Sequence, residues 1–144
     1  MAESRLTLMR AVGRVHREWR RHMRKCALEV GIPESYMSAV MFLSRHPGAN
    51  QRMIAEFTET TTAAVNQVVK RMTDDGLVRK QTSASDGRHT CLYLTEAGLS
   101  KAELLRARLG RSDGEITKRI GEVREGEIIK DLLDVSVFIS TSNL

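Results

Sequence analysis

The feature of this sequence that most constrains its fold is a pair of β-prone segments in a chain whose apolar residues otherwise have helical spacing. The segments LVRKQTS (77–83) and TCLYLT (90–95) flank Asp86 and Gly87, a pair that commonly reverses the chain in a β-hairpin. Before and after this region, apolar residues recur at steps of three and four, as on one face of a helix. The sequence therefore predicts a mainly α chain with one small β-hairpin.

Residues that start and stop helices divide the chain before the hairpin. Gly31 is predicted to end a first helix over residues 4–30, and Pro33 to open a second over 34–45. Asn50 is the predicted N-cap of a short third helix, because its side-chain oxygen can accept a hydrogen bond from the first turn. A fourth helix leads into the hairpin, so the order of elements is that of a winged helix-turn-helix.

The fourth predicted helix, over residues 61–75, carries the pattern that indicates function. One apolar face is formed by Val65, Val68, Val69 and Met72. The other side chains are short, amide or cationic, and none between Thr60 and Thr73 is acidic. Such side chains can reach base edges and phosphates in a major groove, although an ordinary solvated face is the alternative. The candidate DNA-binding residues of this helix are Thr61, Thr62, Ala63, Asn66, Gln67, Lys70 and Arg71.

Beyond the hairpin, a fifth helix is predicted to begin at residues 95–96 and a last helix to span 124–139. Three glycines between residues 110 and 121 argue against one unbroken helix, because each costs about 1 kcal/mol relative to alanine. The terminal segments carry apolar stripes that a lone winged helix would leave partly exposed. Pairing two copies would cover them, so we expect a homodimer.

The formal net charge of +5 belongs to the first predicted helix. Residues 1–30 hold eight Lys/Arg and three Asp/Glu, residues 31–100 hold seven of each, and residues 101–144 hold eight of each. The arginines of the first helix can be solvated while their stems cover apolar surface, or they can contact flanking DNA. The net charge is therefore no argument for DNA recognition by the predicted winged helix.

Composition also indicates the compartment. No run of about 18 apolar residues occurs, which argues against a membrane span. Five arginines lie within the first twenty positions, which argues against a secretory leader. Cys26 and Cys91 are far apart and lack metal-ligand spacing. We expect a cytoplasmic protein with reduced thiols, no metal and no cofactor.

Two segments resemble the MarR family of bacterial transcription regulators, winged-helix proteins that act as dimers. The first is IAEFTETTTAAVNQVVKRMTDDGLVRK (54–80). The second is SDGRHTCLYLTEAG (85–98), which is similar to the family's wing signature: Asp-x-Arg, apolar positions, Leu-Thr, and Gly three residues later. The resemblance covers residues 31–100 and departs from the family at Thr58 and Glu59, where Leu-Gly is usual.

The resemblance implies a repressor or activator that places two winged helices on a palindromic DNA site. It implies that Arg88 reaches into a minor groove and that Asp86 holds its guanidinium through a charge-assisted hydrogen bond. A solvent-exposed turn is the alternative for this wing tip. The implied organisation is a single domain, with dimerisation helices at 1–32 and 100–144 and a DNA-binding lobe at 33–99.

Many members of the family take up phenolic or other small anionic effectors between the dimer helices and the winged helix. The candidates for lining such a pocket are Trp19, His22, Tyr36 and Met37, and ordinary core packing is the alternative for all four. Cys26 lies one helical turn from His22, so a redox-sensing thiolate or half of a metal site competes with a small buried residue. We expect the buried residue.

A second class of function is a protein-docking or RNA-binding module that keeps the winged helix without specific DNA readout. The basic first helix and the polar fourth helix are compatible with it. An enzyme is not expected, because the sequence lacks a Gly-rich phosphate loop, a nucleophile motif and a metal-ligand cluster, and its four histidines are scattered.

Overall fold

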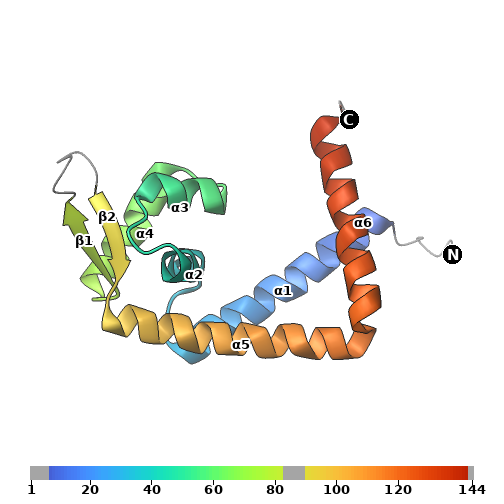
Figure 1. The fold of residues 1–144 in the computed structure, drawn as a ribbon, viewed down its shortest axis with the longest axis horizontal. Helices are drawn as coiled ribbons and strands as arrows, with labels where there is room; N and C mark the ends of the chain where they lie inside the picture. Colours follow the sequence, from blue (N-terminus) through green and yellow to red (C-terminus); the bar gives the residue numbers. More distant parts are fainter. Residues whose placement is uncertain (1–6, 83–89, 143–144) are drawn as a thin grey trace, which may run out of the picture. The chain divides into compact units, whose positions relative to one another are not determined.

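A computed structural model describes residues 7–82 and 90–142 (Figure 1). The described residues are mainly helical with one antiparallel pair of strands, which confirms the predicted fold class. They belong to two compact units, residues 1–106 and 107–144, and each unit is considered by itself. The predicted wing-tip residues Asp86 and Arg88 lie outside the described residues.

The first unit begins with α1, Leu8–Val30. Thr7 caps this helix by accepting a hydrogen bond from the backbone N–H of Arg10 at 3.3 Å. Gly31 ends it in the left-handed conformation (φ 76°), which glycine adopts without a Cβ penalty. The buried part of its apolar stripe is its C-terminal end, at Cys26, Ala27 and Val30. Val15, earlier in the stripe, is 69% exposed.

The second predicted helix is divided in two. Glu34–Tyr36 form a 3₁₀ turn, η1, and α2 runs over Met37–Arg45. Pro33 precedes η1 without a side-chain cap, and the Tyr36 N–H bonds to the Pro33 carbonyl at 3.0 Å in the tighter 3₁₀ pattern. The prediction of one α-helix over 34–45 is therefore correct from Met37 onward, and its first turn is 3₁₀ instead.

The helix-turn-helix consists of α3, Gln51–Thr58, and α4, Thr62–Asp74, and both helices begin at capping side chains. Asn50 Oδ1 accepts a backbone N–H of the first turn of α3 at 3.0 Å, and Thr61 Oγ1 does the same for α4 at 3.1 Å. Gly76 follows α4 in the left-handed conformation (φ 73°), which glycine adopts readily at the end of a helix. These local signals confirm the predicted starts and the predicted end.

The hairpin consists of β1, Val78–Thr82, and β2, Thr90–Leu94, paired antiparallel so that Val78 is opposite Leu94 and Thr82 opposite Thr90. The segment before α3 extends this pairing. Gly48 N–H donates to the Leu92 carbonyl at 2.8 Å, and Leu92 N–H donates to the Ala49 carbonyl at 2.9 Å. These bonds tie β2 to the entrance of the helix-turn-helix.

The core of the first unit draws its side chains from the helices and the hairpin together. Its largest fully buried members are Leu43, Ile54, Met72, Leu92, Leu105, Val40 and Val69. Because they come from α2, α3, α4, β2 and α5, the helix-turn-helix, the hairpin and the start of α5 share one apolar interior.

The helix after the hairpin, α5, runs over Glu96–Ile120 and passes through Gly110 and Gly114 without a break. The expected interruption at these two glycines does not occur, since an isolated glycine costs only about 1 kcal/mol in a long cooperative helix. The chain breaks at Gly121 (φ 87°), and α6 follows over Glu122–Thr141. The last helix predicted over 124–139 is therefore present, with two further residues at each end.

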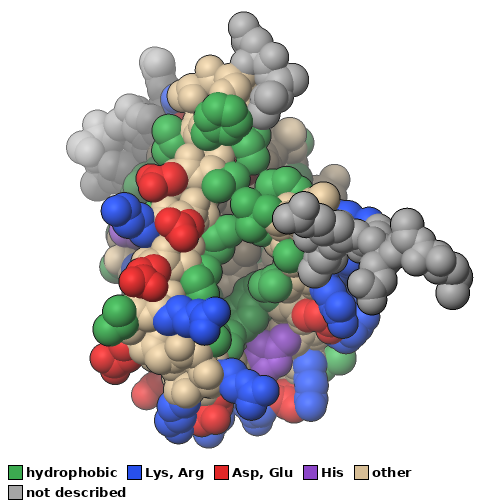
Figure 2. All heavy atoms as spheres, turned by 90° about the vertical axis from the view of Figure 1, so that its right-hand side faces the viewer, with side chains coloured by type: hydrophobic (Ala, Val, Ile, Leu, Met, Phe, Trp, Pro, Cys, Tyr) green, Lys and Arg blue, Asp and Glu red, His purple; other side chains and the backbone are tan. Residues whose placement is uncertain are grey.

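No residue of α6 is buried within the chain. Figure 2 shows hydrophobic side chains along this helix beside a row of acidic ones. Its large exposed apolar residues are Val123, Ile128, Ile129, Leu132, Leu133, Val137, Phe138 and Ile139. Among residues 7–82 and 90–142, no helix combines the length and apolarity needed to cross a membrane.

Short contacts around Thr95 join the hairpin to α5. Thr95 Oγ1 donates to the Gly76 carbonyl at 2.6 Å and accepts from the Gly98 N–H at 3.1 Å. The Thr95 N–H donates to the Leu77 carbonyl at 3.0 Å. A Cβ on Gly98 would overlap this Leu77 carbonyl oxygen and lie 3.1 Å from Leu94 Cδ2. The first turn of α5 can therefore approach the end of α4 this closely only with glycine at position 98.

We predict that Gly98→Ala lowers the free energy of unfolding by about 1–3 kcal/mol, because the added methyl group forces backbone atoms apart. Gly110→Ala is the matched control, since a Cβ at that helical position meets no atom within 4 Å among the described residues. The control should gain about 0.5–1 kcal/mol from helix propensity. Urea unfolding followed by circular dichroism measures both changes, and equal stability of the two variants would refute the close-approach argument.

Candidate nucleic-acid interface

The outward face of α4 is the candidate DNA-reading surface. The helix is held by Val65, Val69 and Met72, each no more than 5% exposed, while Val68 is half-buried. The seven residues singled out from the sequence are all exposed: Thr61, Thr62, Ala63, Asn66, Gln67, Lys70 and Arg71. The structure therefore presents these seven on one helix and its N-cap.

The outward face of α4 is cationic, and some of its polar side chains make no interaction with the rest of the described chain. Lys70 and Gln67 have no side-chain hydrogen bond or ion pair within the part of the chain that the structure describes. Arg71 Nε donates to the Gln67 backbone carbonyl at 3.4 Å, which keeps the guanidinium along the helix. The nearest acidic residues in sequence are Glu59, before the helix, and Asp74 at its last turn. An anion could approach the middle of the face without meeting a carboxylate of this helix.

The turn between α3 and α4 contains Glu59 at φ 52°. Among the described residues, it is the one non-glycine residue with a positive φ, a conformation that costs a residue with a Cβ roughly 1–2 kcal/mol. Thr58 Oγ1 donates to the Ile54 carbonyl at 2.8 Å and lies 2.9 Å from Thr60 Oγ1. These bonds hold the turn at the position where the sequence departs from Leu-Gly.

One side-chain hydrogen bond reaches the outward face of α4 from α3. Gln51 Nε2 donates to Asn66 Oδ1 at 3.2 Å. Gln51 is not among the residues predicted from the sequence to bind DNA. No periodicity within either helix could have paired two residues fifteen positions apart, although a polar residue just after the N-cap of α3 was visible in the sequence.

The end of α4 is fixed to η1 through a buried tyrosine. Tyr36 is 3% exposed, and its hydroxyl donates to Asp75 Oδ2 at 2.7 Å. Burial, followed by the hydrogen bond to Asp75, raises the pKa of Tyr36 to about 12. Tyr36 therefore positions α4 from the core.

The hairpin adds two basic side chains close to the candidate surface in sequence. Arg79 and Lys80 are exposed on β1, and the Arg79 guanidinium lies 4.4 Å from the ring centroid of Tyr93 on β2. This cation–π contact fixes Arg79 against the opposite strand. The base of the wing is therefore cationic, and its predicted tip residues are outside the described part.

A cavity of about 570 Å³ lies beside α1, η1 and α2. Its lining consists of His16, Trp19, Arg20, Met23, Glu34, Ser35, Met37, Ser38 and Thr58. Of the four predicted pocket residues, Trp19 and Met37 line it, while Tyr36 bonds to Asp75 and His22 lies against Cys26. The hydroxyl residues of the lining were missed, because serine and threonine give no helical apolar signal.

The charged groups of this cavity are already paired. Arg20 lies 3.3 Å from Glu34, and Arg24 donates to Glu34 at 3.0 Å. The Arg24 hydrogen bond lowers the pKa of Glu34 below its usual value, so this carboxylate stays ionised. The cavity wall therefore carries an ion-paired carboxylate beside the Trp19 ring.

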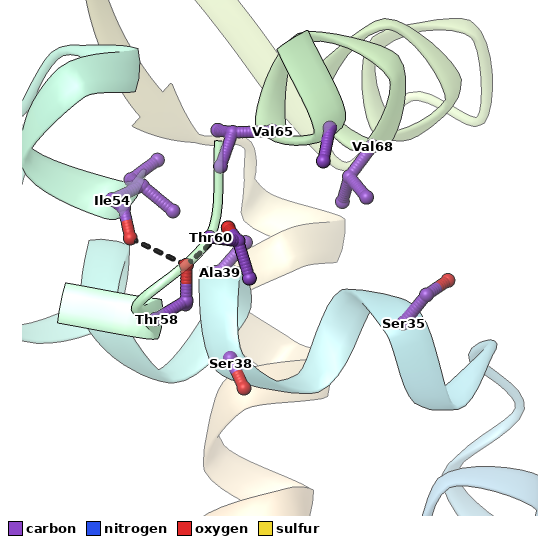
Figure 3. Close-up of a pocket in the computed structure, with 9 residues that line it drawn as sticks. Ser35, Ser38, Ala39, Ile54, Thr58, Thr60, Val65 and Val68 are labelled. Atoms are coloured by element: carbon purple, nitrogen blue, oxygen red, sulfur yellow. Dashed lines mark hydrogen bonds between the residues drawn. The ribbon is translucent and has the colours of Figure 1, made fainter. Parts of the chain in front are cut away.

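A second cavity, of about 230 Å³, lies behind α4 (Figure 3). It shares Ser35, Ser38 and Thr58 with the first cavity, and its apolar lining includes Val65 and Val68 of α4. Figure 3 shows the η1 and α2 side chains on one side of it and the α4 valines on the other. The shared residues join the α1 side of the molecule to the back of α4.

Cys26 is 3% exposed, with its Sγ 3.4 Å from His22 Nε2. Burial on the inner side of α1 agrees with the expected small core residue. Within the described ranges, no group of three or more His, Cys, Asp or Glu side chains is placed to hold a metal ion.

Comparisons with known proteins agree with this geometry. A MarR family model matches residues 30–89. The HTH-type transcriptional regulator PetP of Rhodobacter capsulatus is 33% identical over 76 residues, 49% of this chain and 46% of PetP. The HTH-type transcriptional repressor Rv2887 of Mycobacterium tuberculosis is 28% identical over 100 residues, 69% of this chain and 70% of Rv2887.

A solved structure of the transcriptional repressor CouR, bound to a 23-mer DNA duplex, shares the fold at a TM-score of 0.81. It is 21% identical in sequence, and the match covers 94% of this chain and 96% of CouR. A helix-turn-helix followed by a hairpin defines a winged-helix protein. The match to the MarR family model over residues 30–89 confirms the resemblance seen in the sequence, and the solved structures show that the chain has the winged-helix fold of such regulators.

We predict that Tyr36→Phe lowers the free energy of unfolding by about 1–2 kcal/mol at neutral pH, because it removes a hydrogen bond to a carboxylate. The loss should shrink as pH rises from 10 toward 12. The Tyr36 hydroxyl loses its proton near pH 10 in the unfolded state but only near pH 12 in the folded state, where its pKa is about 12. Between these pH values the free energy of unfolding of the wild type therefore falls, whereas that of Tyr36→Phe lacks this contribution.

Urea unfolding at pH 7 and pH 11 measures both effects. Tyr93→Phe is the control, since the Tyr93 hydroxyl has no hydrogen-bond partner among the described residues. A Tyr36→Phe protein with wild-type stability at both pH values would contradict the assigned role of the hydroxyl.

Proposed function

We propose that this protein is a transcriptional repressor that binds a palindromic DNA operator as a homodimer and is released by a small-molecule effector. The observation that carries the proposal is the exposed, acid-free face of α4, supported from behind by the core and from one end by Tyr36. The match of residues 30–89 to the MarR family model supports it, as does the similarity to the duplex-bound structure of the repressor CouR.

Each part of the face has a distinct role in this proposal. The amides of Asn66 and Gln67 read base edges in the major groove, where amide side chains can both donate and accept. Lys70 and Arg71 contact phosphates or guanine. Thr61, Thr62 and Ala63 form the N-terminal end of the reading helix, where backbone N–H groups favour a phosphate. Arg88, held by Asp86, enters the adjacent minor groove.

Dimerisation is proposed through segments 1–32 and 100–144, which flank the DNA-binding lobe at 33–99. Exposed apolar side chains in both compact units support it. In the first unit these include Leu8, Met9, Val15, Leu99 and Leu104, and in the second they are concentrated on α6. A monomer would leave this apolar surface in water, whereas a two-fold dimer would bury it and place two α4 helices on one duplex.

We predict that the protein enriches a palindrome from a pool of random duplexes, because a two-fold dimer reads the same half-site twice. On the selected duplex, Lys70→Ala and Arg88→Ala should each weaken binding and reduce the slope of log affinity against log salt by about 1. Asp86→Ala should also weaken binding, although it removes a negative charge. Fluorescence anisotropy across a salt series measures all three.

Arg45→Ala is the charge-matched control, because Arg45 is exposed at the last turn of α2, outside the proposed contact residues and both proposed dimerisation segments. It should leave affinity and slope at wild-type values. Enrichment of no duplex, together with retention of RNA or of a protein partner, would favour a docking or RNA-binding module instead.

The effector is proposed to enter the 570 Å³ cavity beside Trp19. A small aromatic or anionic molecule fits the Trp19 ring and the polar groups around it. The shared residues Ser35, Ser38 and Thr58 extend this wall to the cavity behind α4. A ligand that displaces them would bias the position of α4, which is the coupling that release from DNA requires.

We predict that a member of a panel of aromatic acids and phenols quenches Trp19 fluorescence and releases the selected duplex over the same concentration range. Trp19 is the only tryptophan, so the signal reports this cavity directly. Ser38→Phe, which fills the junction of the two cavities, should abolish both responses while DNA affinity is retained. The proposal of an effector site would be withdrawn if no panel member changed either signal.

A further inference from the structure

The Gln51–Asn66 hydrogen bond links the first residue of α3 to the middle of the candidate reading face. Gln51 Nε2 is the donor and Asn66 Oδ1 the acceptor, at 3.2 Å. Gln51 is half-buried, whereas Asn66 is exposed. The bond is therefore made at the edge of the α3–α4 pair: Gln51 is partly enclosed by the protein, and Asn66 faces solvent.

Helix packing brings these two side chains together. Ile54 and Ala55, one turn after Gln51, are at most 5% exposed and lie on the face of α3 that is packed inward. Asn66 follows Val65, which is buried at the start of α4. Gln51 lies in the first turn of α3, on the side of the helix that is packed inward. Its amide can therefore reach Asn66 near the start of α4.

An asparagine amide has an accepting end and a donating end, and a free side chain can present either to a base. The bond from Gln51 engages Oδ1, and Nδ2 is left as the end that can donate. Fixing the amide also removes rotamer freedom before DNA arrives, so less side-chain entropy is lost when DNA binds. The bond thus orients the Asn66 amide and holds it in that orientation before DNA binds.

We propose that Gln51 determines base specificity through Asn66, by turning the Asn66 amide so that Nδ2 donates to an acceptor on a base edge. This inference rests on the proposed binding of duplex DNA by α4. In the major groove guanine presents two acceptors, N7 and O6, without a donor, adenine pairs its N7 acceptor with the N6 amino donor, thymine presents the single acceptor O4, and cytosine presents the N4 amino donor. A donating Nδ2 therefore favours guanine most, because guanine offers two acceptors, and disfavours cytosine, which offers none.

Gln51 is a positioning residue in this scheme, and two variants separate that role from a direct DNA contact. Gln51→Ala frees the Asn66 amide to turn. Gln51→Glu replaces the donor with a carboxylate, which can only accept, so that Nδ2 turns toward α3 and Oδ1 faces the base. The two variants predict different changes in base preference, beyond any general loss of affinity from the added negative charge.

The experiment is a duplex selection with wild type, Gln51→Ala, Gln51→Glu, Asn66→Ala and the Gln51→Ala/Asn66→Ala double variant, each first shown to unfold cooperatively. In wild type, one base pair of each half-site should prefer guanine by roughly tenfold, and Asn66→Ala should flatten that preference. Gln51→Ala should reduce it below about threefold at the same base pair, and only there. Gln51→Glu should shift it toward cytosine or adenine, whose amino groups can donate to Oδ1.

The double variant decides whether Gln51 acts through Asn66. If it does, adding Gln51→Ala to Asn66→Ala changes base preference no further. An additional change in that background, a wild-type preference in Gln51→Ala, or no effect of Asn66→Ala would each overturn the inference. A wild-type protein that enriches no duplex would instead show that the proposed function had failed, because the inference is then lost before any variant is compared.

Discussion

The contact between the first turn of α5 and the segment that follows α4 is the constraint on which the rest of the winged helix depends. Gly98 lies against the Leu77 carbonyl, and Thr95 bonds to both Gly76 and Gly98. Both ends of the hairpin and the start of α5 therefore meet at Gly76 and Leu77, the segment between α4 and β1. A rigid junction here fixes the direction in which the strands leave, so the wing and the reading helix are positioned together.

Wherever structure depends on neighbours in sequence, the sequence predicted it well. The N-cap at Asn50 and the helix end at Gly31 follow from local backbone chemistry, and both are where residue type indicated. The outward face of α4 follows from helical periodicity alone. The predicted interruption at Gly110 was wrong, because a long cooperative helix tolerates the cost of one glycine.

The remaining features depend on distances between elements that sequence spacing does not encode. The Tyr36–Asp75 bond joins residues 39 positions apart, and the Gln51–Asn66 bond joins residues fifteen apart. Tyr36 is a pocket candidate by residue type, but its ring is buried and its hydroxyl donates to Asp75 at the end of α4. The wing-tip roles of Asp86 and Arg88 rest on family resemblance, since the turn chemistry of Asp-Gly requires no ligand.

The net positive charge of this molecule lies on a different part of the chain from the side chains proposed to read DNA. The excess of cations lies on the first helix, and two of its arginines are paired with Glu34. Residues 31–100 carry equal numbers of acids and bases, so the lobe that holds α4 has little net charge with which to attract a polyanion. What α4 offers is a local separation, with its acids confined to its ends and its amides and cations exposed between them. Discrimination between DNA sequences must then come from the orientation of individual side chains, and a neutral residue such as Gln51 can matter as much as a charged one.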